Sequence, residues 1–269
     1  MTGAERPTLL LVNDDGWDSP MLRPLAAALG RLGRVRLAIP TREQGWQGKS
    51  VTRACAVRVE VVDGLGCAAY SVDGTPADCV NLAVHELFPD PPHWVISGIN
   101  MGWNVGYTLA INSGTIGGAL EAALEGLPAV AFSQLVAPEV YRAWHTRGEL
   151  GGAEVEAMVD AAVTRAAAMV ARLLTTGLPA GAMLLSVNFP RGLGPETPVR
   201  WAPLLENRTG RLFARGEDGA YHHHYTGDVH RTATGASDRE IVEQGAVSVT
   251  ALSLGGLSAP PPARDPFAS

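Results

Sequence analysis

The chain has 269 residues and a net charge of −6 at pH 7, and 46% of its residues are apolar. This length fits one large α/β domain or two small ones. The negative charge, without any basic stripe, excludes general nucleic-acid binding, and no apolar run is long enough to span a membrane. Residues 1–11 lack a signal-peptide pattern, so we expect a cytoplasmic protein with neither nucleic acid nor membrane as a partner.

The first predicted strand covers residues 8–12, an apolar run without helical periodicity. A helix is expected over residues 19–33, because its leucines recur on one face. Ser19 would be the N-cap of this helix and Pro20 its first residue.

Strand-like and helix-like segments then alternate as far as residue 190. Strands are expected at 35–39, 51–62, 67–72, 94–97, 128–133 and 183–188, helices at 75–87, 113–125 and 153–175, and loops at 40–50 and 98–112. Segments 51–62 and 67–72 would pair antiparallel, and Thr75 would cap the helix that follows them. This alternation predicts an α/β fold whose mostly parallel sheet is covered by helices on both faces.

Helical periodicity is lost after Pro190, and proline, glycine and arginine become frequent. We expect residues 1–190 to form the core and residues 191–258 to form a β-rich C-terminal extension of the same domain. The extension would consist of hairpins and loops and include a strand at 246–252. Residues 259–269, APPPARDPFAS, are expected to be a disordered tail.

Two adjacent carboxylates, Asp14 and Asp15, follow the first predicted strand. Open α/β sheets bind ligands at the carboxyl ends of their strands. Like charges that are this close repel each other, and a hard divalent cation relieves the repulsion. The alternative is a polar turn in which the two side chains only cap the next helix.

Asn100 follows the predicted strand at 94–97 and has glycines on both sides. Its side-chain oxygen could join Asp14 and Asp15 around a cation, and ligation by oxygen alone suits Mg²⁺ or Mn²⁺. The alternative is that Asn100 and Asn104 only accommodate unusual backbone angles in a loop.

Asn112-Ser113-Gly114-Thr115 opens a predicted helix. Unpaired N–H groups at a helix N-terminus bind anions, and Gly114 would allow a phosphate to approach the backbone. The hydroxyls of Ser113 and Thr115 could donate to phosphate oxygens. The same residues would also make an ordinary capped helix.

Other titratable residues form weaker patterns. Cys55, Cys67 and Cys79 lack zinc-site spacing and are expected to be buried free thiols. The run 222–224 is three histidines, which cannot all lie on one side of a strand, so a solvated loop is expected. Glu121 and Glu125 share a helix face and are expected to be solvated.

Several segments together resemble the SurE family of survival-protein phosphatases, the 5′/3′-nucleotidases. They are VNDDGWDSPML at 12–22, IPTREQGWQGKSVT at 39–52, VDGTPADCVNLAV at 72–84, VISGINMGWNVG at 95–106 and NSGTIGGALEA at 112–122, with weaker matches in SVNFP at 186–190 and AVSVTAL at 246–252. The resemblance implies a Rossmann-like three-layer core and a C-terminal extension that exchanges with a partner subunit, in a homodimer or homotetramer. It further implies a phosphomonoesterase that hydrolyses nucleoside 5′- or 3′-monophosphates.

The resemblance also assigns site residues and a cofactor. Asp14, Asp15 and Asn100 correspond to the ligands of one divalent metal ion, Mg²⁺ or Mn²⁺, in each subunit. Asn104, Ser113 and Thr115 correspond to residues near the substrate phosphate. In this interpretation the metal lowers the pKa of a bound water, which attacks the phosphate.

The chain departs from the family pattern at Gly45, where the family usually has a serine metal ligand after the glutamine. Water could take the place of that hydroxyl, because Mg²⁺ and Mn²⁺ commonly keep water ligands. Three other functions are alternatives to the nucleotidase. They are an aspartyl-phosphate phosphatase, a zinc deacetylase, and a catalytically silent nucleotide-binding or assembly protein on the same fold, which Gly45 favours.

Overall fold

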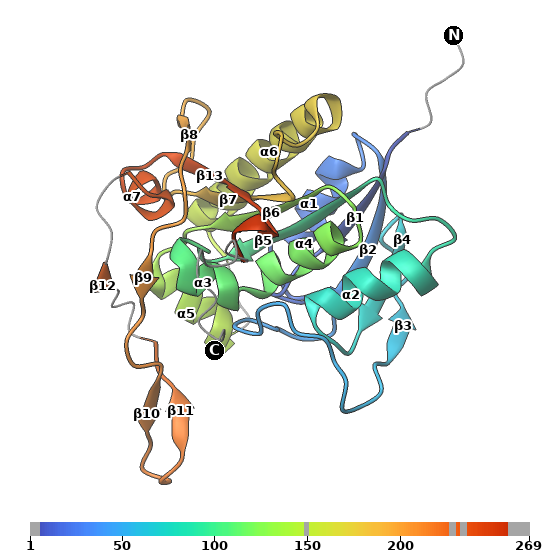
Figure 1. The fold of residues 1–269 in the computed structure, drawn as a ribbon. Helices are drawn as coiled ribbons and strands as arrows, with labels where there is room; N and C mark the ends of the chain where they lie inside the picture. The colour runs from blue at the N-terminus through green and yellow to red at the C-terminus, as the bar shows by residue number, and fades with distance from the viewer. Residues whose placement is uncertain (1–5, 148–150, 226–229, 232–235, 258–269) are drawn as a thin grey trace, which may run out of the picture.

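The computed structural model describes residues 6–147, 151–225, 230–231 and 236–257. Its main feature is a nine-stranded sheet in the order β3-β4-β2-β1-β5-β6-β7-β13-β8 (Figure 1). The central strands are β1 (Thr8–Val12), β2 (Arg34–Pro40), β4 (Ala68–Val72), β5 (Trp94–Met101), β6 (Ala129–Gln134) and β7 (Leu184–Phe189), which are all parallel. The mostly parallel sheet confirms the expected α/β class.

Helices cover both faces of the sheet (Figure 1). On one face lie α1 (Leu22–Leu29) and α6 (Ala153–Thr176), whose apolar side chains form one core cluster with the sheet. On the other lie α2 (Pro76–Leu82), continued by the π-helical turn η1 (Ala83–Leu87), and α4 (Gly114–Leu124), which form a second cluster. The structure is therefore the expected Rossmann-like three-layer arrangement. No helix among the described residues is long and apolar enough to cross a membrane.

The two sheet margins carry the antiparallel strands. At one margin β3 (Val59–Val61) pairs with β4, so the expected hairpin forms but its first strand is much shorter than residues 51–62. At the other margin β13 (Val247–Leu252) pairs antiparallel with β7 and parallel with β8 (Val199–Trp201). The C-terminal extension thus adds two strands to the central sheet.

The rest of the extension lies outside the sheet. Strand β10 (Phe213–Arg215) pairs with β11 (Tyr221–His223) in a hairpin that projects from the body, and β9 (Asn207–Arg208) pairs with β12 (His230–Arg231) (Figure 1). A short helix, α7 (Asp238–Glu243), precedes β13, and the turn η2 (Leu254–Leu257) follows it. The predicted disordered tail, residues 259–269, lies outside the described residues.

Two expectations about local structure are wrong, and two helices were missed. Residues 98–112 are not a single loop, because β5 continues to Met101 and α3 (Gly106–Asn112) follows. Helix α1 has Met21 as its N-cap instead of Ser19. Helices α5 (Pro138–Arg147) and α7 were not predicted.

Helix α3 shows why sequence patterns missed it. The N–H of Gly106 donates to Asp238 Oδ2 at 2.7 Å, and the N–H of Tyr107 donates to the carbonyl of Leu205 at 3.0 Å. Its first turn is thus satisfied by residues about 100 or more positions away, which no local propensity encodes.

Candidate active site

Three loops meet at the carboxyl ends of the parallel strands. The loop after β2 joins the loop after β1, because the N–H of Gln44 donates to the carbonyl of Asp14 at 2.7 Å. The end of β5 joins the same loop, because the N–H of Met101 donates to Asp15 Oδ2 at 3.0 Å. These bonds hold the two aspartates between β2 and β5.

Asp14 is held by the start of α4. Thr115 donates its hydroxyl to Asp14 Oδ1 at 2.6 Å and its backbone N–H to Asp14 Oδ2 at 3.0 Å. Gly114 makes this approach possible, because a Cβ there would lie 2.8 Å from both Asp14 Cβ and the carbonyl oxygen of Gln44. The side chain of Asp14 is therefore held in one orientation, and both of its carboxylate oxygens already accept a hydrogen bond.

Asp15 has a different environment. Its Oδ2 accepts the bond from Met101 and lies 3.5 Å from the Ser19 hydroxyl. Ser19 thus faces the carboxylate instead of capping α1. Asp15 Oδ1 accepts no hydrogen bond from the described part of the chain. This oxygen is the one that is open to a ligand.

The two carboxylates are buried, and burial dominates their electrostatics. Burial raises the pKa of Asp14 from 3.8 to about 6, although the bonds from Thr115 oppose this shift. Burial and then the charge of Asp14 raise the pKa of Asp15 well above its ordinary value. The Glu43 carboxylate raises both pKa values further. Within the described ranges no basic side chain forms an ion pair with either aspartate.

This donor set fits a hard divalent cation. Two buried, unpaired carboxylates need positive charge, and oxygen ligands suit Mg²⁺ or Mn²⁺. Asn100 precedes Met101, the residue that binds Asp15, and its partly exposed carboxamide has no hydrogen-bond partner in the described ranges. The described residues contain no group of three or more His, Cys, Asp or Glu that could hold a metal. A site here would therefore combine two carboxylates with an amide oxygen.

The other predicted residues lie at the start of α4 and on the loop after β5. Ser113 is the N-cap of α4, and its Oγ accepts from the N–H of Ile116 at 3.1 Å, so its hydroxyl proton stays available. Asn104 is buried; it donates its backbone N–H to Asn188 Oδ1 at 2.7 Å and Nδ2 to Ser133 Oγ at 2.8 Å. Thr115 uses both of its donors on Asp14 and so positions that aspartate.

Sequence reasoning missed several residues around this site. Asn188 and Ser133, at the ends of β7 and β6, hold Asn104, and their positions at strand ends were the available signal. Tyr141 of α5 lies near the acidic group: burial, then the charges of Glu43, Asp15 and Asp14, raise the pKa of its phenol. No pattern in the sequence pointed to Tyr141.

The weaker candidates lie outside this site, and several expectations about their burial are corrected. Glu121 is buried, not solvated: its Oε2 lies 2.6 Å from Lys49 Nζ and its Oε1 accepts from Asn81. Residues 222–224 are exposed, as expected, but 222 and 223 belong to strand β11 and not to a loop. Of the cysteines only Cys79 is buried, whereas Cys67 is half-buried and Cys55 is exposed.

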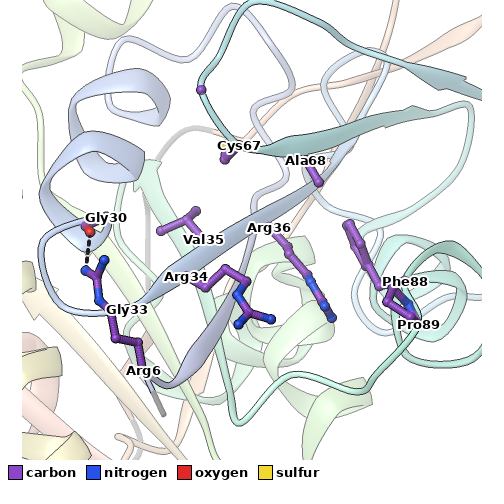
Figure 2. Close-up of a pocket in the computed structure, with 11 residues that line it drawn as sticks. Arg6, Gly30, Gly33, Arg34, Val35, Arg36, Cys67, Ala68, Phe88 and Pro89 are labelled. Carbon is purple, nitrogen blue, oxygen red and sulfur yellow. Dashed lines mark hydrogen bonds between the residues drawn. The ribbon is translucent and has the colours of Figure 1, made fainter. Parts of the chain in front are cut away.

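A pocket of about 590 Å³ opens at the opposite edge of the sheet (Figure 2). Arg34 and Arg36, at the amino end of β2, line it together with Phe88. The guanidinium of Arg36 donates to the Asp90 carbonyl and lies over the Phe88 ring. Because β2 runs from this pocket toward the loop at 41–50, the pocket is separated from the aspartates by the length of a strand. It is not part of the candidate site.

Known proteins resemble this chain over most of its length. The family described as survival protein SurE matches residues 9–211, which is more than half of the chain. The chain belongs to the SurE family. Proteins named 5′-nucleotidase SurE share 33% identity over 92% of both chains in Methanosarcina barkeri and 38% identity over 71% of this chain and 70% of the relative in Methanocella arvoryzae. The SurE crystal structure from Aquifex aeolicus superposes with a TM-score of 0.70 and 30% identity, over 92% of this chain and 94% of the other.

Proposed function

We propose that this SurE-family chain hydrolyses nucleoside 5′- or 3′-monophosphates to nucleoside and phosphate with one Mg²⁺ or Mn²⁺ in each subunit. The single observation that carries the proposal is the buried pair Asp14–Asp15, which has no basic partner in the described ranges. The name 5′-nucleotidase of its relatives supports the nucleotide as substrate. We also propose that it acts in the cytoplasm.

Asp14, Asp15 and Asn100 would hold the cation. When bound, a divalent cation would supply positive charge to the phosphate and lower the pKa of water. Thr115 fixes the Asp14 carboxylate, and the peptide of Met101 fixes the Asp15 carboxylate, so both are preorganised for this role. Asp15 Oδ1, which accepts no bond from the described residues, would be the oxygen that contacts the cation.

The start of α4 would receive the phosphate. The dipole of α4 stabilises negative charge at its N-terminus, and the Ser113 hydroxyl can donate to a phosphate oxygen. The N–H groups of Thr115 and Ile116 already donate to Asp14 and Ser113 and are not part of this site. Asn104, locked by Asn188 and Ser133, would add an amide donor. As the water oxygen would bond to phosphorus, the ester P–O bond would break, and the proton that the water loses would balance the one that the leaving sugar oxygen takes up.

Release of inorganic phosphate tests this function directly. The purified chain is incubated with a nucleoside 5′-monophosphate, the 3′-isomer and glycerol 2-phosphate, each with and without Mn²⁺. We expect release from the nucleotides only when the metal is present. If no phosphomonoester is hydrolysed under any condition, the proposal is wrong.

Gly45 keeps one alternative open, a nucleotide-binding or assembly protein that is catalytically silent. Glycine supplies no side-chain oxygen at the position where the family usually has a serine. In that case the phosphate-release assay would detect no phosphate, whereas equilibrium dialysis would show that the nucleotide binds to the chain.

We also propose a homodimer or homotetramer formed through the extension. Val199 and Trp201 of the edge strand β8 are 45% and 59% exposed, and Phe213 and Tyr221 of the β10–β11 hairpin are 53% and 70% exposed. Exposed apolar side chains on an unpaired strand edge favour association. Light scattering should give at least twice the mass of one chain, and a monomer at micromolar concentration would contradict this proposal.

A further inference from the structure

Trp46, in the loop after β2, has an unusual backbone. Its φ is 60°, and it is the only non-glycine residue with positive φ in the described ranges. For a bulky side chain this region is a genuine outlier, and such residues cluster at ligand sites, where the surrounding structure enforces the strain. The side chain also remains 36% exposed. The observation therefore raises the question of what this exposed tryptophan binds.

Backbone hydrogen bonds hold the loop in place before and after Trp46. Before it, the N–H of Gln44 donates to the carbonyl of Asp14; after it, the N–H of Gly48 donates to the carbonyl of Asn112 at 2.9 Å. Lys49 adds the ion pair with the buried Glu121. Consecutive Cα atoms are about 3.8 Å apart, so the Cα of Trp46 lies within about 8 Å of the Cα of Gln44, whose N–H donates to the carbonyl of Asp14. The backbone of Trp46 is thus held at the border of the proposed metal and phosphate site.

Two aromatic residues of the extension contact Trp46. The His223 ring lies 4.7 Å from it, with an interplanar angle of 58°, and the Tyr225 ring lies 5.2 Å away in an edge-to-face arrangement. Tyr225 in turn packs against the cluster of Val105 and Leu109, directly after Asn104. The aromatic group Trp46–His223–Tyr225 therefore spans from the loop beside Asp14 to the loop that carries Asn104.

We propose that Trp46 is the base-recognition residue of this chain, on which the nucleobase of the substrate stacks; this rests on the nucleotidase function proposed above. The phosphate at α4 and a base on Trp46 would be the two ends of one nucleoside monophosphate. Stacking tolerates every base, because each has a π face. Recognition at Trp46 would thus favour nucleotides over other phosphomonoesters without selecting one base.

Trp46 could instead serve only to hold the extension against the core. The two roles differ in what they do to substrates. A packing residue affects all phosphomonoesters alike, whereas a stacking residue affects only those that carry a base. The comparison of AMP with ribose 5-phosphate isolates the base, since the two share the sugar and the phosphate.

The test uses two variants with the same backbone requirement, Trp46→Leu and Trp46→Phe. We expect Trp46→Leu to raise the KM for AMP about tenfold and to change the KM for ribose 5-phosphate by less than about twofold. Trp46→Phe keeps an aromatic face and should keep the KM for AMP within about threefold of the original protein. Thermal melting and light scattering of both variants would check folding and assembly.

Equal changes in the two KM values, or none, would overturn the proposal while leaving the nucleotidase function intact. If the unmodified chain releases phosphate from neither substrate, the proposed function fails instead. Equilibrium dialysis of AMP against the same variants then decides the role of Trp46. Weaker AMP binding by Trp46→Leu alone supports stacking, and unchanged binding contradicts it.

Discussion

Thr115 gives both of its hydrogen-bond donors to Asp14, the hydroxyl at 2.6 Å and the N–H at 3.0 Å. One residue at the start of α4 thus orients a carboxylate at the end of β1, 101 positions earlier in the chain. Because hydrogen bonds to the charged form favour ionisation, these bonds also counter the effect of burial on the pKa of Asp14.

Thr115→Val should therefore weaken the site without opening a cavity, since valine has nearly the same shape. The pKa of Asp14 would rise further, and the Mn²⁺ concentration for half-maximal activity should increase about tenfold, as for the loss of one charge-assisted hydrogen bond. The measurement is activity against Mn²⁺ concentration. Thr115→Ser, which keeps both donors, is the matched control, and an equal change in both variants would contradict the role of the hydroxyl.

Asp14→Asn should abolish most phosphatase activity and stabilise the metal-free fold. The pKa of Asp14 is raised in the folded protein, so its ionisation lowers the free energy of unfolding. This loss of stability is absent below about pH 3.8 and complete above about pH 6. The gain in melting temperature of the variant over the original protein should therefore grow as pH rises across this range. Mn²⁺ should raise the melting temperature of the original protein only. A constant difference between the two proteins from pH 4 to pH 7 would rule out this electrostatic account.

Gly45→Ser should lower the Mn²⁺ concentration needed for half-maximal activity by restoring a hydroxyl. Gly45 does not have a positive φ, so serine needs no strained backbone. A Cβ there would lie 2.5 Å from Glu43 Oε1, the end of a flexible side chain that can move. Gly194→Ser is the control, because a Cβ there meets no atom within 4 Å. An unchanged metal dependence in a normally folded Gly45→Ser variant would show that a hydroxyl at residue 45 does not bind the metal.

Asp238→Ala should destabilise the fold by about 2–4 kcal/mol, because it leaves buried donors unpaired. The Asp238 carboxylate accepts from the N–H groups of Gly106, Leu205 and Arg239 at 2.7, 3.2 and 2.9 Å. It thereby joins the extension to the start of α3, beside Asn104. Chemical denaturation measures the effect, with the exposed Asp160→Ala as control. Similar stability of the two variants would mean that this junction contributes little.

The sequence was sufficient where local pattern and tertiary structure agree. Thr75 caps α2 in a capping box with Asp78, as its spacing predicted, and the apolar run at 8–12 is a fully buried strand. The meeting of Asp14, Asp15 and the loop after β5 followed from the rule that parallel strands end at one edge.

The remaining features depend on contacts between distant residues. Helix α3 begins where Asp238, 132 positions away, accepts its first N–H. Glu121 becomes buried because Lys49, on another loop, pairs with it. Neither periodicity nor spacing encodes such partners, and the same limitation hid Asn188, Ser133 and Tyr141 near the site.

The most direct test of the account is phosphate release from AMP by chelator-treated protein, before and after Mn²⁺ is added back. We predict no release without metal, recovery of release with Mn²⁺, and no recovery in Asp15→Asn. Full activity after chelation, or an Asp15→Asn variant as active as the original protein, would contradict the claim that the buried aspartate pair holds the catalytic metal.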